Sequence, residues 1–271
     1  MKTRNQTVIN STGLMEGKRG VIMGVANDHS IAWGIAKRLA AQGAELAFTF
    51  QGDALEKRVR PLAESVGSTK LFHCDVETDG SIYTAFETIA DSWSTIDFVV
   101  HAIAYSDKEE LNGRYVETTR ENFQRTMEVS CYSFTETART ASLFMPEGGS
   151  LLTLSFSGAE RVVPNYNVMG VAKAALEASV RYLACDLGQQ GIRVNAISAG
   201  PVRTLAGSAV AGARHIFRWS QEHAPLKRNA GLEEIGGSAL YLLSDLSNGV
   251  TGEVHHVDSG YNVVGIPALD V

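Results

Sequence analysis

The sequence predicts a doubly wound α/β fold, in which seven parallel strands form one sheet with helices on both faces. Short β-rich runs alternate with longer helical stretches across residues 18–257. The apolar residues of these runs are continuous rather than alternating, which is typical of parallel strands covered on both faces. No proline-rich or low-complexity linker divides the 271 residues. We therefore expect a single α/β domain spanning residues 1–271.

The expected elements follow one another as repeated β-α-β units. The expected strands are residues 20–23, 45–50, 70–74, 98–102, 150–155, 193–198 and 253–257. The expected helices are residues 31–42, 55–66, 81–93, 120–145, 166–187 and 232–243. Asp53, with Glu56 three residues later, has the form of a helix N-cap with its capping partner. In such a sheet the ligand lies beyond the carboxyl ends of the strands, so function is expected in the loops that follow them.

Composition and charge exclude several classes of protein. A chain that is 44% hydrophobic and 20% charged is typical of a soluble globular protein rather than a disordered or membrane-spanning one. The net charge of -6 argues against nucleic acid or an anionic membrane as the main partner. Residues 1–17 lack the apolar region of a signal peptide and are expected to form a polar arm.

The cysteines and histidines predict a cytoplasmic protein without a metal. Cys74, Cys131 and Cys185 lie far apart and without C-x-x-C spacing, which indicates reduced structural thiols. The seven histidines form no H-x-x-x-H or H-E-x-x-H pair. His255 and His256 are adjacent, but neighbours on a strand point to opposite faces.

The loop after the first strand, residues 24–30, leads directly into a helix. A pyrophosphate bound there would meet free backbone N–H groups and the positive end of the helix dipole. Gly24 would permit a tight turn, Ser30 could hydrogen-bond a phosphate, and Gly34 could let the helix approach the sheet closely. The spacing is not the usual G-x-G-x-x-G, so an ordinary strand-to-helix turn is the alternative.

The next three strand ends also carry residues suited to a dinucleotide. The amide of Gln51 can bind a free ribose 2′-hydroxyl but would not neutralise a 2′-phosphate, which favours NADH over NADPH. Asp75 could accept a hydrogen bond from the adenine amino group, and Val76 could pack on the ring. Residues 101–106 are small and apolar enough for a nicotinamide ribose and a flat substrate. Each residue alone could belong to a capped turn, but together they favour a cofactor site.

Tyr166 and Lys173 stand seven residues apart in a helical sequence. Seven steps sweep roughly 700°, within about 20° of two full turns, so both side chains are expected on one helix face. A lysine beside a tyrosine lowers the cost of phenolate character and allows proton transfer. The alternative is a half-buried aromatic and a solvated charge.

These residues and several longer segments resemble the type I enoyl-acyl-carrier-protein reductases, a divergent branch of the short-chain dehydrogenase/reductase superfamily. The matching segments are 24, 30–32, 51, 74–76, 158–161, 164–173, 193–201, 203–206, 252–254 and 256–258. The resemblance spans about residues 14–262, and the seven-residue Tyr-to-Lys spacing separates it from the common relatives, which use four.

The resemblance implies a Rossmann-like fold and NADH-dependent reduction of the trans-2 double bond of enoyl thioesters, carried by acyl carrier protein, in fatty acid biosynthesis. It further implies a cytoplasmic homotetramer. The implied cofactor-binding residues are Gly24, Ser30, Ile31, Gln51, Asp75, Val76, Ile103, Lys173, Val202, Thr204, Leu205 and Ala206. Tyr166 matches the tyrosine that contacts the thioester carbonyl, and Lys173 the lysine that holds the nicotinamide ribose. Ser106 and Phe156 match substrate-side positions.

The chain departs from the family pattern at Phe156, where many members carry a second tyrosine. Phenylalanine has no hydroxyl and cannot exchange a proton, although some related reductases also carry it. A paralogue with altered chain-length preference or reduced activity therefore stays open. Two further alternatives stay open. One is a ketone or alcohol dehydrogenase, although the chain lacks the Tyr-x-x-x-Lys motif of those enzymes, and the other is an NADH-binding protein without catalysis.

The segment 203–224 follows a strand end and combines apolar residues with two glycines. This composition suits a mobile lid over a fatty acyl chain, and the alternative is a short core helix with a flexible loop. Four basic residues in or after the segment could contact the acidic carrier protein or could be plain solvated charges. They are Arg214, Arg218, Lys227 and Arg228.

Overall fold

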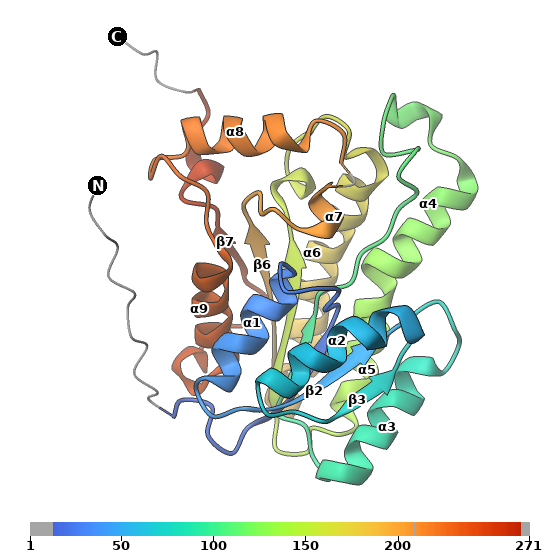
Figure 1. Ribbon diagram of the computed structural model, residues 1–271, viewed down its shortest axis with the longest axis vertical. Helices are drawn as coiled ribbons and strands as arrows, with labels where there is room; N and C mark the ends of the chain where they lie inside the picture. The colour runs from blue at the N-terminus through green and yellow to red at the C-terminus, as the bar shows by residue number, and fades with distance from the viewer. Residues whose placement is uncertain (1–12, 209, 267–271) are drawn as a thin grey trace.

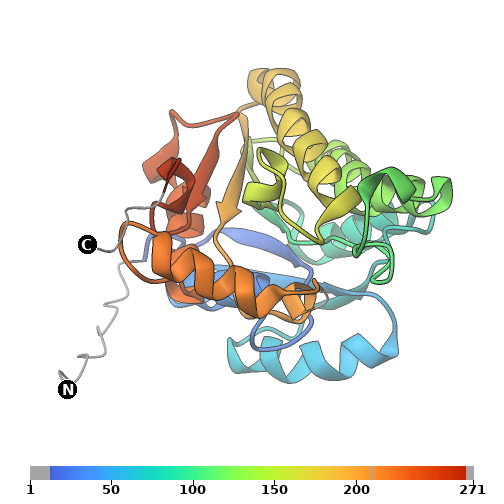
Figure 2. The ribbon, with the colours of Figure 1, turned by 90° about the horizontal axis from the view of Figure 1, so that it is seen from above.

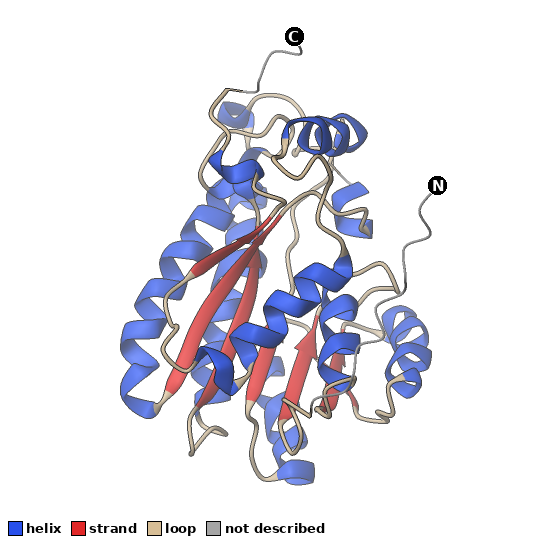
Figure 3. Cartoon of the chain, turned by 90° about the vertical axis from the view of Figure 1, so that its left-hand side faces the viewer, coloured by secondary structure: helices blue, strands red, loops and turns tan. Residues whose placement is uncertain are grey.

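The computed structural model describes residues 13–208 and 210–266, which form one parallel sheet of seven strands between layers of helices (Figure 1, Figure 3). The strands are β1 (Arg19–Met23), β2 (Glu45–Phe50), β3 (Leu71–His73), β4 (Phe98–His101), β5 (Gly149–Ser155), β6 (Ile192–Ala199) and β7 (Val254–Val257). The main helices are α1 (Ile31–Ala40), α2 (Asp53–Ser65), α3 (Ser81–Trp93), α4 (Arg120–Met127), α5 (Ser133–Ser142), α6 (Asn167–Leu187), α7 (Leu205–Ser208), α8 (Ala213–His223) and α9 (Leu232–Leu243). The predicted fold class is confirmed.

The strand order, β3-β2-β1-β4-β5-β6-β7, reverses direction between β1 and β4. All six strand pairs are parallel, so every carboxyl end lies at the same edge of the sheet. In open α/β sheets the crevice at such a reversal is where ligands bind. The topology therefore places the candidate site over the ends of β1 and β4.

Two hydrophobic layers bury the two faces of the sheet. Phe86, Trp93 and Phe134 belong to the layer under α3, α5 and α6. Trp33 and Ile235 belong to the opposite layer, under α1 and α9. Both layers contain side chains from the central strands, which explains why the strand sequences are continuously apolar.

The predicted helix over residues 120–145 is wrong, because a wide turn interrupts it. Residues Glu128–Tyr132 form a π-helical turn between α4 and α5, and α5 ends at Ser142. The hydroxyl of Ser133 donates to the carbonyl oxygen of Val129 at 2.7 Å and supports this turn. Such turns carry one extra residue and are frequent at functional sites.

Two helix starts also differ from expectation. Asp53 is the first residue of α2 rather than its N-cap, because Gly52 holds the cap position with a φ of 78°, a conformation that favours glycine. Tyr166 lies just before α6 as its N-cap, with φ -114° and ψ 8°, rather than inside the helix. Its carbonyl oxygen still accepts a hydrogen bond from Gly170, so it remains in register with the helix.

The expected polar arm, residues 1–17, lies mostly outside the described residues. Within its last part Met15 is fully buried, and its backbone N–H donates to the carbonyl oxygen of Gln42 at 2.9 Å. The end of this arm is therefore packed on the domain instead of extending into solvent.

Candidate active site

The loop after β1 has the shape expected of a phosphate-binding loop. Gly24 has a φ of 97°, and a Cβ there would lie 2.1 Å from the carbonyl oxygen of Ala102. Only glycine fits this contact, which brings the ends of β1 and β4 together. Ile31 begins α1, and the N–H groups of Ile31 and Ala32 make no hydrogen bond among the described residues. These open donors and the tight turn fit a pyrophosphate.

Ser30 and Gly34 act differently from the simplest expectation. The Ser30 hydroxyl accepts hydrogen bonds from the N–H groups of Ala26 and Asn27, at 3.0 and 3.1 Å, so it shapes the loop itself. A Cβ on Gly34 would lie 2.8 Å from Leu232 Cβ of α9. The expected close approach to the sheet is wrong, and Gly34 lets α1 approach α9.

The strand order brings four predicted cofactor positions into a row. Asp75 follows β3, Gln51 follows β2, Gly24 follows β1 and Ile103 follows β4 closely. Gln51 is exposed, whereas Val76 and Ile103 are partly buried against the same core layer. This row runs along the carboxyl edge and suits an extended dinucleotide, with the adenine end over β3 and β2.

Asp75 is held in place by the loop that carries it. Its N–H donates to the Ser81 hydroxyl at 2.9 Å, and its Oδ1 accepts from the N–H of Glu77 at 3.0 Å. Among the described residues its Oδ2 makes no hydrogen bond. That oxygen is therefore free to accept from the adenine amino group.

The predicted cofactor residues after β6 lie in a short structured segment. Val202 is partly buried against the second core layer, and the hydroxyl of Thr204 accepts from the N–H of Gly207 at 2.9 Å. Leu205, which is exposed, and Ala206 begin α7. Because β6 is two strands from β4 in the sheet, this segment lies at the opposite end of the row from Asp75.

Lys173 is buried near the end of β5. Its side chain is 6% exposed, and its Nζ donates to the carbonyl oxygen of Leu154 at 2.8 Å. Burial lowers the pKa of Lys173 from 10.5 to about 8, although Cys131 and Glu177 oppose the change. The ammonium therefore keeps its charge at neutral pH but loses it readily above.

Tyr166 is a neutral hydrogen-bond donor rather than a phenolate. The expected lowering by Lys173 is wrong, because burial raises the pKa of Tyr166 well above its usual value. Its ring makes an edge contact with Phe156, with ring centroids 5.2 Å apart. Phe156 thus packs against the tyrosine that the sequence predicts to be catalytic.

Two glycines allow Tyr166 to take its position. A Cβ on Gly158 would lie 2.5 Å from the Tyr166 ring, and a Cβ on Gly170 would lie 2.8 Å from the carbonyl oxygen of Gly158. Asn165 has a φ of 60°, and its side-chain amide donates to the carbonyl oxygen of Ala211 at 3.0 Å. No local sequence pattern singles out Asn165, because its role depends on a turn and on a distant loop.

Glu177 was also missed. It lies one turn after Lys173 on α6, is 7% exposed, and accepts a hydrogen bond from the Ser155 hydroxyl. Burial raises its pKa, and the Ser155 hydrogen bond opposes that rise. A buried carboxyl at i+4 from a predicted catalytic lysine is the signal that could have revealed it.

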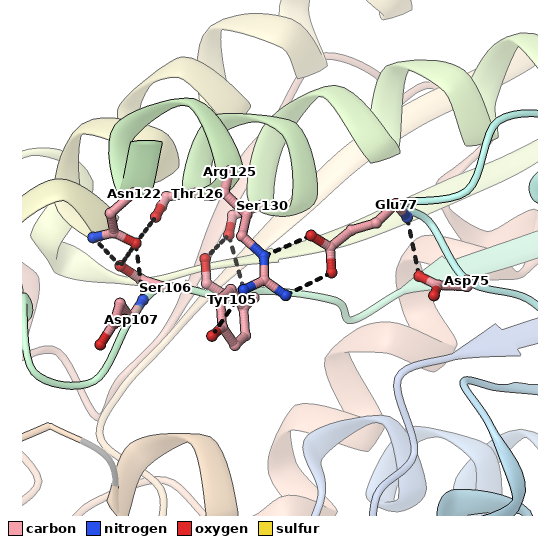
Figure 4. Close-up of polar contacts among 9 residues, drawn as sticks. All are labelled: Asp75, Glu77, Tyr105, Ser106, Asp107, Asn122, Arg125, Thr126 and Ser130. Atoms are coloured by element: carbon pink, nitrogen blue, oxygen red, sulfur yellow. Dashed lines mark hydrogen bonds and ion pairs between the residues drawn. The ribbon is translucent and has the colours of Figure 1, made fainter. Parts of the chain in front are cut away.

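The loop after β4 is tied down by hydrogen bonds from α4 and the following turn (Figure 4). The Ser106 hydroxyl lies 3.3 Å from Asn122 Oδ1, which also accepts from the N–H of Asp107 at 2.9 Å. The Ser130 hydroxyl accepts from the Tyr105 N–H and donates to the Tyr105 carbonyl oxygen, both at 2.9 Å. The predicted substrate-side Ser106 therefore lies in a rigid loop.

Phe156, whose ring contacts Tyr166, also lines a cavity of about 320 Å³. The cavity is lined by the loop 162–165, the end of β6 with Gly200 and Pro201, and residues Ile216 and Trp219 of α8. Figure 2 shows α8 extending over the carboxyl edge of the sheet. Within α8 only Ser220 is fully buried, so the alternative of a core helix is not supported.

Residues 13–208 and 210–266 contain neither a metal-ligand cluster nor a membrane-spanning helix. No group of three or more His, Cys, Asp or Glu side chains in this part of the chain could hold a metal ion. His256 instead pairs with Glu160, with Nε2 and Oε1 3.6 Å apart. None of the helices described is long and apolar enough to cross a bilayer.

Comparisons with known proteins agree with this geometry. The family model described as enoyl-(acyl carrier protein) reductase matches residues 24–262. The chain is 64% identical over 258 residues to enoyl-[acyl-carrier-protein] reductase [NADH] 2 of Rhizobium meliloti, covering 95% of this chain and 96% of that protein. It is 53% identical over 259 residues to the NADH enoyl reductase FabI of Rickettsia typhi, covering 96% and 99%.

Solved structures of relatives have the same fold. The crystal structure of FabI from Candidatus Liberibacter asiaticus has a TM-score of 0.92 and 59% identity, covering 94% of this chain and 99% of that chain. The structure of the reductase from Anaplasma phagocytophilum in complex with NAD also has a TM-score of 0.92 and 59% identity, covering 94% and 98%. The chain belongs to the enoyl-(acyl carrier protein) reductase family.

Proposed function

We propose that the protein uses NADH to reduce the trans-2 double bond of enoyl thioesters carried by acyl carrier protein, in fatty acid elongation. The observation that carries this proposal is a neutral tyrosine hydroxyl, Tyr166, at the start of α6 and a buried lysine, Lys173, seven residues later on the same helix. The relatives in Rhizobium meliloti and Rickettsia typhi bear the same activity in their names. The absence of a Tyr-x-x-x-Lys motif disfavours the ketone or alcohol dehydrogenase.

The roles of Tyr166 and Lys173 follow from where charge develops. NADH, when bound, supplies the hydride that reaches the β-carbon of the thioester. Negative charge then builds on the thioester oxygen, and the Tyr166 hydroxyl donates a hydrogen bond to it. Lys173 holds the ribose hydroxyls, and its positive charge stabilises the enolate. The α-carbon then takes a proton, which Phe156 cannot supply because it has no hydroxyl.

The cofactor preference rests on the exposed amide of Gln51 at the end of β2. An amide binds a free 2′-hydroxyl but does not neutralise a 2′-phosphate, which favours NADH. The Bacillus cereus relative, 51% identical, has been crystallised with NADP⁺. Rates with NADH and NADPH are therefore best compared side by side in each assay.

Replacing Tyr166 by Phe tests the proposed chemistry. We expect the reduction of a 2-dodecenoyl thioester with NADH to fall about 100- to 1,000-fold, because the oxyanion loses its donor. NADH affinity, measured by fluorescence titration, should persist. Tyr83→Phe on α3, which removes the hydroxyl of an exposed tyrosine, is the control and should keep full activity.

Different outcomes would contradict the function and the proposed role of Tyr166. Wild-type protein that reduces neither coenzyme A nor carrier-protein thioesters would exclude the enoyl reductase. Full activity of the Tyr166→Phe variant would remove Tyr166 from the mechanism. Tight NADH binding without any turnover would instead support the binding protein without catalysis.

The lowered pKa of Lys173 predicts the pH dependence of NADH use. Activity should fall as the pH rises through about 8, because Lys173 loses the charge that holds the ribose and stabilises the enolate. Tyr166 does not titrate in this range, since its pKa is raised. A profile of kcat/KM for NADH between pH 6 and pH 10 measures the effect, and Lys173→Arg should move the basic limb upward. An unmoved limb would assign it to another group.

We also propose that residues 203–224 form a lid and that the cavity lined by Phe156, Ile216 and Trp219 receives the acyl chain. Replacing Ile216 by Trp should fill the cavity and lower kcat/KM for a dodecenoyl thioester roughly tenfold relative to the crotonyl thioester. Gln221→Trp adds the same side chain to an exposed position of α8 and should leave that ratio unchanged. Equal loss with both chain lengths in Ile216→Trp would argue against an acyl site.

The carrier protein is proposed to approach α8. Arg214 and Arg218 are exposed on this helix and make no ion pair among the described residues. Lys227 and Arg228 are less suited, because Lys227 donates to the Glu222 carbonyl oxygen and Arg228 pairs with Glu234. A basic pair beside the lid fits an acidic partner that delivers a thioester.

We propose a cytoplasmic homotetramer that assembles through the surface of α4, α5 and α6. Tyr132, Leu143 and Tyr182 are 55%, 63% and 76% exposed on or beside these helices, and exposed apolar side chains of this size mark interfaces. Light scattering should give the mass of four chains. Tyr182→Glu should shift it toward smaller species, and a monomeric wild type would exclude the assembly.

A further inference from the structure

One arginine joins two loops that lie 28 residues apart in the chain (Figure 4). The guanidinium of Arg125 on α4 forms two parallel hydrogen bonds with Glu77, Nε to Oε1 at 2.6 Å and Nη2 to Oε2 at 3.0 Å. The same group lies over the ring of Tyr105, with Cζ 4.2 Å from the ring centroid, and Nη1 donates to the Tyr105 hydroxyl at 3.2 Å. A bidentate and stacked arginine is far more ordered than a single surface ion pair.

Each partner of Arg125 belongs to a loop that is proposed to contact a ligand. Glu77 follows Asp75 in the loop after β3, and its N–H donates to the carboxylate of Asp75, the proposed acceptor for the adenine amino group. Tyr105 precedes Ser106 in the loop after β4, and both backbone groups of Tyr105 are bound by Ser130. Arg125 therefore connects the adenine side of the site to the substrate side.

Asn122, which lies about one turn before Arg125 on α4, ties this helix to the loop after β4. Asn122 and Thr126 lie three residues before and one residue after Arg125, and both are buried. Asn122 Oδ1 accepts from the Asp107 N–H at 2.9 Å and from the Thr126 hydroxyl at 3.3 Å. Arg125 is the member of this group that reaches the loop after β3, at the surface, with 49% of its side chain exposed.

We propose that Arg125 is a positioning residue that fixes the spacing between the adenine-side loop and the substrate-side loop, so that NADH and the thioester bind to a site already assembled. This inference rests on the proposed roles of Asp75 and Ser106. Among the described residues Arg125 contacts neither Tyr166 nor Lys173, so the chemical step does not depend on it. Replacing Arg125 is therefore expected to weaken the binding of NADH and the thioester rather than to lower kcat.

The test is Arg125→Met, which keeps much of the length and apolar stem of the side chain. We expect KM for NADH and KM for the thioester each to rise about 3- to 10-fold, with kcat within about twofold of wild type. Arg60→Met is the matched control. Arg60 is 46% exposed and pairs with Glu56, but both residues belong to α2, so no loops are joined and both KM values should stay unchanged.

A double-mutant cycle separates the positioning role of Arg125 from a general loss of stability. If Arg125 acts through Glu77, the Glu77→Met and Arg125→Met variants and their combination should share one KM for NADH, because each breaks the same link. A merely structural role would lower the melting temperature and leave the KM values in place. Unchanged KM values, a change in kcat alone, or additive effects in the double variant would overturn the proposal.

Direct NADH binding keeps this test independent of turnover. Calorimetry should show weaker NADH binding by Arg125→Met even if the wild type reduced no enoyl thioester. Unchanged binding would overturn the positioning role of Arg125. Asp75→Ala reports on the adenine site alone, and undiminished affinity there would remove the basis of the proposal. If Arg125→Met does not fold, Glu77→Met and Tyr105→Leu decide, since each removes one side of the link and both should weaken NADH binding.

Discussion

Parallel strands that are buried on both faces leave all their carboxyl ends at one edge, and the rest of this structure depends on that constraint. The edge is closed at its centre by the contact of Gly24 with the Ala102 carbonyl, which no larger residue permits. From this point the loops after β3, β2, β4 and β6 extend to either side. The long cofactor and the acyl chain can then occupy opposite ends of one continuous edge. Lys173 lies near the end of β5, and Tyr166 contacts Phe156, which lines the cavity together with Ile216 and Trp219.

Much of the fold and part of the site were predictable from the sequence, because both depend on local pattern. Continuous apolar runs located each end of the seven strands to within one residue, since strands buried on two faces tolerate few polar side chains. The candidate residues Gln51, Asp75 and Ile103 follow from the same pattern, because they stand at strand ends. The family assignment is confirmed by relatives that match nearly the whole chain.

The features that could not be predicted depend on contacts between distant segments. Helical periodicity over 120–145 does not register one extra residue in a turn, so the π-helical turn was missed. The pKa of Tyr166 is set by burial rather than by its neighbour seven residues away, so its direction could not be read from spacing. The link between Glu77 and Arg125 joins residues 48 positions apart, and neither has a distinctive local sequence.

The wide turn at Glu128–Tyr132 has a geometric consequence for the helices on either side of it. One added residue rotates the second helix by roughly 100° relative to an uninterrupted one. In an uninterrupted helix Phe134 would stand about 120° around the axis from Asn122, and the added residue reduces this to about 20°. Asn122, which holds the loop after β4, and Phe134, which enters the core layer, therefore lie on one face. The inserted residue lets a single helical rod support a ligand loop with its first half and stabilise the domain with its second.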